Sequence, residues 1–159
     1  MSQSTTSKLF LIGGLYLSQG IPNGFFRHTA PVVFRESGIS LEQIALWFPA
    51  LYIPWMLKFI LSIFVDKFHS KNYGKYRSWI VPLQILTAGV MVAVSNWQLG
   101  GPVALFVLAV ALINIFSSLQ DVATDGQAVQ LLDESERGLG NAIQVGTFWA
   151  GYVLSLIHI

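Results

Sequence analysis

A long apolar stretch that ends in two carboxylates constrains this chain more than any other feature. Residues 103–119 form an apolar run, and the segment QDVATDG follows it directly. If the run is a helix, Asp121 and Asp125 lie one turn apart on the same face. Asn114 and Ser118 continue this polar stripe. Carboxylates beside an apolar segment are costly unless they face protein or water, so the stripe is the first candidate for function.

The composition indicates a membrane protein. Of the 159 residues, 53% are hydrophobic and only 11% are charged, whereas soluble domains carry about 25% charged residues. The net charge of +1, without a broad basic patch, gives no reason to expect a nucleic-acid partner. The chain has no cysteine, and neither His28 nor His69 has a second ligand at metal-binding spacing. We therefore expect a lipid bilayer as the surroundings, and neither a metal nor a cofactor.

Five apolar stretches are long enough to cross a bilayer, which takes about 20 helical residues. We therefore predict an all-α polytopic bundle that forms a single membrane domain over residues 1–159. The predicted spans lie at about residues 9–29, 42–65, 78–96, 102–132 and 139–159. Residues 1–8 would form a polar leader, and residues 31–41 would form the first loop.

Prolines and a capping motif predict details of the first two spans. Pro22 is expected to kink the first span, and Pro49 and Pro54 are expected to bend the second. Ser40 is the expected N-cap of the second span, with Gln43 three residues later completing a capping box.

Small residues predict where helices approach one another closely. Gly20 and Gly24 form a GxxxG pattern in the first span, which offers a flat surface to a neighbouring helix. In the fifth span, Ala142, Gly146 and Ala150 form a seam that is expected to serve the same purpose.

Basic residues predict the orientation. The loop at residues 66–77 holds four of the nine lysines and arginines, namely Lys67, Lys71, Lys75 and Arg77. Cytoplasmic loops carry such an excess, so we place this loop and the N-terminus in the cytoplasm. Asp121 and Asp125 then lie near the cytoplasmic end of the fourth span. The short N-terminus and the lysine-rich loop favour a bacterial inner membrane.

Polar side chains in the first two spans are candidates for a solute path. Gln19, Asn23 and Arg27 recur at helical spacing; amides suit a sugar or peptide, and arginine suits a carboxylate or phosphate. The alternative is that the amides bond to neighbouring helices and that Arg27 lies at the outer interface. Lys58 would bind an anionic part of the solute, neutralise a carboxylate, or snorkel to the headgroups.

The fourth span adds Asn114 and Gln120 to this candidate path, and its carboxylates suggest proton coupling. Asp121 and Asp125 would share a proton readily in a low-dielectric site, because both cannot ionise cheaply there. The competing interpretation is a salt bridge to Lys58, or to an arginine in the following turn, that closes a cytoplasmic gate. Both interpretations stay open at this point.

Five segments, in this order and at this spacing, resemble the major facilitator transporters. They are QGIPNG in the first span, WMLKFILSIFVDKF in the second, KNYGKYRSWIVPLQ leading into the third, LQDVATDGQAV in the fourth and ESERGLGNA before the fifth. The nearest branch holds the AmpG-type muropeptide permeases and the acetyl-CoA transporters. In that family two six-helix halves enclose the solute site, so the resemblance implies that this chain is most of an N-terminal half.

The resemblance implies a secondary transporter and not an enzyme, with proton-coupled import of a muropeptide-like or other sugar, peptide or acyl solute. An acetyl-CoA or drug-like solute is the alternative within the same branch. A conformational latch of Asp66, Lys67 and Arg77 is also implied, although topology alone would account for these charges. The usual facilitator signature has a glycine where this chain has Ser62.

The expected partners are a small-molecule solute, protons, the bilayer and a missing C-terminal half, because five spans are an unusual number. Residues 155–159 resemble translated read-through of a sequencing adapter, so we assign His158 no role. Two rival interpretations come from other classes. One is an intramembrane enzyme that uses Asp121 and Asp125, and the other is a scaffold or receptor that moves no solute.

Overall fold

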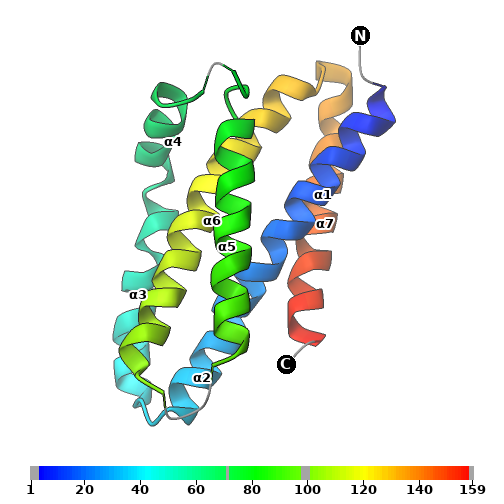
Figure 1. The fold of residues 1–159 in the computed structure, drawn as a ribbon. Helices are drawn as coiled ribbons and strands as arrows, with labels where there is room; N and C mark the ends of the chain where they lie inside the picture. The colour runs from blue at the N-terminus through cyan, green and yellow to red at the C-terminus, as the bar shows by residue number, and fades with distance from the viewer. Residues whose placement is uncertain (1–3, 71, 98–100, 158–159) are drawn as a thin grey trace.

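The computed structural model describes residues 4–70, 72–97 and 101–157. Within these residues every regular element is a helix, which confirms the predicted all-α class (Figure 1). The helices run alternately up and down, so that the N-terminal end, the loop at residues 66–77 and the start of the last helix lie at one end. Lys71 of the basic loop, and His158 and Ile159, lie outside the described residues.

The helical run at the first predicted span is longer than predicted. Helix α1 (Thr5–Gly24), the π-helix η1 (Phe25–Thr29) and helix α2 (Ala30–Glu36) follow one another without a break. The Ser4 side chain caps the start, so residues 5–8 of the predicted leader are helical. Pro31 does not end the helix, because it lies in the first turn of α2. The prediction of a loop from residue 31 was therefore wrong; the chain turns at Gly38, whose φ is +86°.

The second span is two helices, α3 (Leu41–Met56) and α4 (Lys58–Lys67), whose axes differ by 41° at a break on Leu57. The predicted capping box of Ser40 and Gln43 begins α3. Pro49 and Pro54 both remain inside α3, so the bend comes three residues after the second proline and not at either of them.

The remaining helices match their predicted spans to within two residues where the structure describes them. They are α5 (Arg77–Ser95), α6 (Val103–Leu131), the 3-10 turn η2 (Glu134–Glu136) and α7 (Arg137–Ile157). Among the described residues, α5 and α6 are long and apolar enough to cross a membrane, and the bent pair α3–α4 adds a third candidate. The assignment of the first and last helices as spans stays a prediction.

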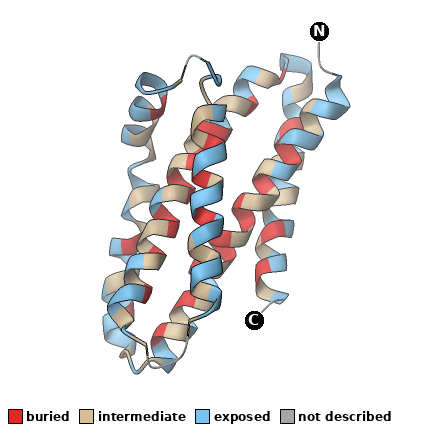
Figure 2. Ribbon diagram, viewed as in Figure 1, coloured by how far each residue is buried: buried red, intermediate tan, exposed pale blue. Residues whose placement is uncertain are grey.

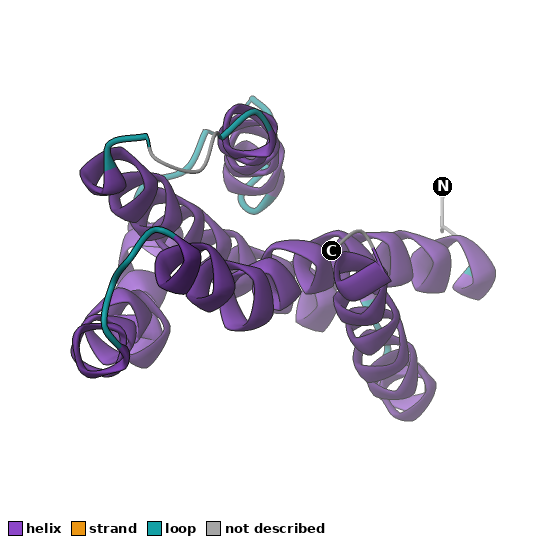
Figure 3. Cartoon of the chain, turned by 90° about the horizontal axis from the view of Figure 1, so that it is seen from below, coloured by secondary structure: helices purple, strands orange, loops and turns teal. Residues whose placement is uncertain are grey.

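Helix α6 is the centre of the bundle. It packs against α1, α3, α4 and α5, and buried residues recur along its length (Figure 2). At about 1.5 Å per residue its 29 residues measure roughly 43 Å, more than the hydrocarbon core of about 30 Å. By contrast, α5 buries only Ile80, Leu83 and Thr87. Viewed from below, the helices spread into separate arms and do not close around one axis (Figure 3).

The predicted GxxxG surface finds its neighbour in α7. A Cβ at Gly20 would meet the backbone of Phe148, and a Cβ at Gly151 would meet the backbone of Leu17. The predicted seam of small residues in α7 was wrong: Gly146 has open space around it, and Ala142 and Ala150 are exposed. The face of α7 that meets α1 instead includes Gly151, because only this face brings a glycine opposite the glycines of α1.

Candidate functional site

The polar stripe of α6 is buried for most of its length. Asn114, Ser118, Gln120 and Asp121 are each 6% exposed or less. Asp125, one turn beyond Asp121, is exposed. The stripe therefore points into protein at its centre and emerges towards solvent at the end that lies nearest the N-terminus.

Lys58 forms an ion pair with the carboxylate of Asp121, which joins α4 to α6. The Asp121 side chain is 9% exposed and the Lys58 side chain 35%. The Lys58 ammonium also lies 4.7 Å from the centre of the Trp55 ring. Of the two carboxylates it is thus Asp121 that Lys58 neutralises, while the arginine of the following turn, Arg137, approaches Glu134 instead.

Trp55 is a member of the site that sequence reasoning missed. Its indole N–H donates to Asn114 Oδ1 at 3.1 Å, so one tryptophan connects α3 to the stripe on α6 and its ring contacts the lysine of the ion pair. The available signal was the i, i+3 spacing from Trp55 to Lys58, which puts both side chains on one face of a helix.

Asp125 has a separate partner. The Tyr16 hydroxyl of α1 donates to its carboxylate, and Gln144 of α7 donates to the same hydroxyl oxygen at 3.1 Å. The two carboxylates therefore face different neighbours: Asp121 faces α4, and Asp125 faces the α1–α7 pair. Tyr16 belongs to the polar stripe of the first span, although it was not among the predicted site residues.

The amides of the first span are buried. Gln19 donates to the Thr124 hydroxyl at 2.8 Å, which supports the interpretation that it bonds to a neighbouring helix. Its other side-chain atom, Oε1, is buried without a described partner. Asn23 is also buried. Arg27, in contrast, is exposed and donates to the Tyr52 hydroxyl of α3 at 3.0 Å.

The proposed latch residues are not brought together. Asp66 pairs with Lys75 at 2.8 Å, within its own loop. Lys67 lies 5.7 Å from the Phe68 ring, and Arg77 is exposed. This loop does reach α6, where the Tyr76 ring packs on Gly126 so closely that a Cβ there would collide with it.

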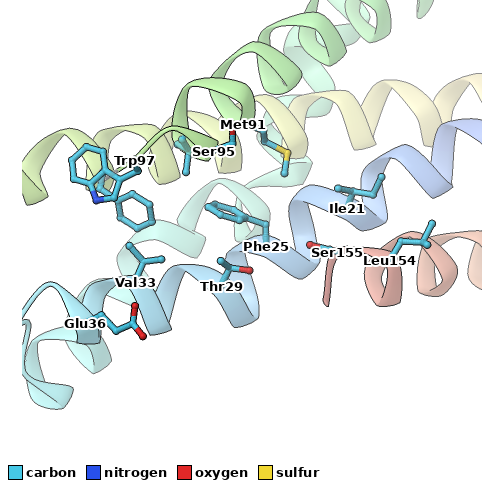
Figure 4. Close-up of a pocket in the computed structure, with 12 residues that line it drawn as sticks. Ile21, Phe25, Thr29, Val33, Glu36, Met91, Ser95, Trp97, Leu154 and Ser155 are labelled. Atoms are coloured by element: carbon cyan, nitrogen blue, oxygen red, sulfur yellow. The ribbon is translucent and has the colours of Figure 1, made fainter. Parts of the chain in front are cut away.

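Two cavities adjoin Asp125. One of about 450 Å³ has Lys58, Asp66 and Asp125 in its lining, and one of about 390 Å³ has Tyr16, Asp125 and Gln144. A larger cavity, of about 710 Å³, lies among α1, α2, α5 and α7, and Figure 4 shows its lining. That lining is mainly apolar and contains none of the predicted site residues, so we place the site at the polar cavities. In the described part of the chain no three acidic or histidine side chains cluster to hold a metal ion.

Comparison with known families identifies the chain. A family model described as acetyl-coenzyme A transporter 1 matches residues 8–107, well over half of the sequence. The chain belongs to this family. This family assignment confirms the branch that the sequence motifs predicted. The matched range includes Gln19, Arg27 and Lys58 but ends before Asp121.

Curated relatives of this family member extend the match over nearly the whole chain. The anhydromuropeptide permease of Escherichia coli K12 is 26% identical over 153 residues, covering 96% of this chain and 30% of the relative. An uncharacterized membrane protein of Saccharomyces cerevisiae is 26% identical over 176 residues, covering 93% and 30%. An uncharacterized protein of Schizosaccharomyces pombe is 27% identical over 147 residues, covering 89% and 28%. The chain thus spans about a third of these relatives' length. No solved structure matches it.

Proposed function

We propose that this chain forms part of a secondary transporter in which the Lys58–Asp121 ion pair couples proton movement to solute movement. The observation that carries the proposal is a charged pair joining two membrane helices in a member of this family. Charged groups within membrane helices are costly and tend to mark ion or solute pathways.

The pair lies next to the break in the second span, which suggests how coupling works. Lys58 is the first residue of α4, immediately after the break at Leu57. A proton on Asp121 removes the negative charge that holds Lys58, so α4 is free to turn relative to α6. An anionic group of the solute then takes the place of the carboxylate at Lys58.

The solute we propose is a sugar–peptide or acyl compound with an anionic group. The family description names acetyl-coenzyme A, and the Escherichia coli relative is named for anhydromuropeptides. Gln19, Asn23, Asn114 and Gln120 are the proposed polar lining. We also propose that a matching C-terminal half completes the transporter and that protons are the coupling ion. The proposed location is a bacterial inner membrane, with the N-terminus in the cytoplasm.

Enzymatic use of the two carboxylates is less well supported. Aspartyl chemistry needs two carboxylates that face each other, whereas here Asp121 is paired with Lys58 and Asp125 is bonded to Tyr16. An enzyme of this kind would convert a lipid or peptide in liposomes without moving solute across the bilayer, so product analysis beside flux separates the two functions.

The test is Asp121→Asn in the intact protein, reconstituted in liposomes with a labelled anhydromuropeptide and acetyl-CoA as the probe solutes. We expect uptake driven by a pH gradient to fall to background, because the asparagine side chain cannot take up and release a proton. Exchange of solute at equal pH should persist. Normal gradient-driven uptake by this variant would remove Asp121 from the coupling mechanism. Glu134→Gln, which neutralises an exposed carboxylate at the same end of the molecule, is the control and should transport normally.

A further inference from the structure

A further pocket, separate from the carboxylates, lies where the π-helix η1 meets α3 and α7. It is an open pocket of about 510 Å³, within the usual range for small-molecule sites of about 300–1,000 Å³. Its lining consists of the residues Phe26, Arg27, His28, Phe48, Pro49, Tyr52 and Tyr152. Apart from Arg27, none of these residues was among the predicted site residues.

The π-helix places two nitrogen-bearing side chains at one pocket. Arg27 and His28 are consecutive, and both line it. Arg27 reaches Tyr52 on α3, whereas His28 Nε2 lies 2.5 Å from the Tyr152 hydroxyl on α7. Single π-turns inside α-helices occur frequently at functional sites, and here the turn connects the two opposite walls of the pocket.

Arg27 lies well inside the helix and not at its end. Because the helical run continues to Glu36, nine residues separate Arg27 from its end, or about 14 Å at about 1.5 Å per residue. The interpretation of Arg27 as an outer-interface residue depended on a span that ended near residue 29. Arg27 is also exposed, so its guanidinium is accessible to an anion.

The charge of Arg27 has no acidic partner in the described residues. It donates one hydrogen bond to Tyr52 and lies 5.5 Å from the centre of that ring, but it forms no ion pair there. A guanidinium has five N–H donors, so several remain for a ligand. The Tyr52 oxygen accepts from Arg27, which leaves the hydroxyl hydrogen of Tyr52 free to donate as well.

The wall beside these donors is a stack of aromatic rings. The Phe26 ring stacks on Phe48 at 4.8 Å and on Tyr52 at 6.1 Å, with interplanar angles of 19° and 14°. Tyr52 stacks in turn on Trp55, which contacts Lys58. An aromatic face next to unpaired donors suits a ring that carries an oxyanion.

We infer that this pocket is a solute subsite for a carboxylate or phosphate attached to a sugar or nucleoside ring. Arg27 and Tyr52 bind the oxyanion, and the rings of Phe48 and Tyr152 line the space for the rest of the solute. The inference rests on the proposed transport function and adds a binding site for the anionic group of the solute. Tyr52 contacts Arg27 and Trp55 contacts Lys58, so two stacked rings of α3 connect this subsite to the ion pair between α4 and α6.

Thermal stabilisation of the purified intact protein in phospholipid-free detergent tests the subsite. The probes are two matched pairs: N-acetylmuramic acid with N-acetylglucosamine, and adenosine 5′-phosphate with adenosine. We expect the charged member of at least one pair to stabilise the protein and the uncharged member to fail. Arg27→Gln should weaken that binding roughly tenfold or more, since hydrogen bonds to charged groups contribute about 1.5–3 kcal/mol.

Controls make the outcomes distinct. Arg35→Gln removes an exposed arginine from the same helical run outside the pocket and should bind normally; Tyr52→Phe should weaken binding less than Arg27→Gln. The subsite would be overturned if Arg27→Gln bound the charged probe as tightly as the parent protein. It would also be overturned if neither charged probe stabilised the protein while phosphatidylglycerol did so in a way that depends on Arg27. Glu134→Gln, outside both sites, should bind the charged probe like the parent. If Asp121→Asn transports normally while binding of the charged probe still depends on Arg27, coupling at Asp121 fails and the subsite stands.

Discussion

The two sides of the bundle are joined by different kinds of contact. On one side, α1 and α7 meet through glycines, so closely that the backbone of each helix fills the place of a side chain on the other. On the other side, α3 and α4 meet α6 through long polar side chains, above all the Lys58–Asp121 pair and the Trp55–Asn114 hydrogen bond. Backbone contacts of the first kind resist sliding, whereas an ion pair next to a helix break can open and close.

This contrast assigns different roles to the two carboxylates. Asp125 is bonded to Tyr16, which belongs to the closely packed α1–α7 pair, while Asp121 is bonded to α4, which begins at the break. We therefore expect the movable contact to be at Asp121 and the fixed one at Asp125. Three further predictions test the comparison, in order of decreasing effect.

The largest effect is expected from Gly151→Leu. A Cβ at this position would collide with the backbone of Leu17, so the α1–α7 contact would have to separate. We expect the free energy of unfolding to fall by about 3 kcal/mol or more. The measurement is the loss of monodisperse protein in detergent. Gly146→Leu on the same helix has open space and should leave the protein folded. If both variants fold equally well, the glycine contact is not what joins these helices.

An intermediate effect is expected from Lys58→Gln, which leaves the Asp121 carboxylate without its cation. Removing one partner of a fully buried pair costs about 3–5 kcal/mol, and the 35% exposure of Lys58 reduces this to about 1–3 kcal/mol. Thermal unfolding in detergent measures the loss. The double variant Lys58→Gln/Asp121→Asn should regain part of the stability, with an interaction energy of about 1 kcal/mol. Strictly additive losses would show that the two side chains do not act as a pair.

The smallest effect concerns pH at the turn before α7. Glu136 accepts hydrogen bonds from Lys8, Thr5 and the backbone N–H of Asp133, which lower its pKa to about 2. A lowered pKa in the folded state means that this contact stabilises the fold above the ordinary carboxyl pKa, and that the stabilisation is lost as the pH falls towards 2. The protection of the amides of residues 133–137 against hydrogen exchange, relative to their intrinsic rate at each pH, should therefore fall with acidification.

The matched variant for the pH measurement is Glu136→Gln. It cannot ionise, so exchange in this turn should be fast at neutral pH and should change little on acidification beyond the intrinsic rate. An unchanged acid response in Glu136→Gln would assign the pH dependence to another group, such as Asp133, which also pairs with Lys8.

Much of the candidate site was predictable because helical spacing puts residues three and four apart on one face. This rule placed Asn114, Ser118 and Asp121 on a single stripe, and the structure buries all three. A second rule indicated Lys58 as a neighbour for a carboxylate, because an isolated cation in an apolar segment needs a partner. What spacing could not predict was which carboxylate Lys58 would choose, because that depends on how α4 lies against α6.

The sequence alone determined the helical class, the membrane composition, the capping box at Ser40 and the helices that cover the third to fifth predicted spans, because each follows from local periodicity and turn chemistry. Tertiary structure decided the rest: that α1 pairs with α7 through Gly20 and Gly151, that the second span bends at Leu57, and that Tyr52 and Trp55 turn inward towards Arg27 and Lys58. These outcomes depend on contacts between residues distant in the chain, whose energies no local pattern contains.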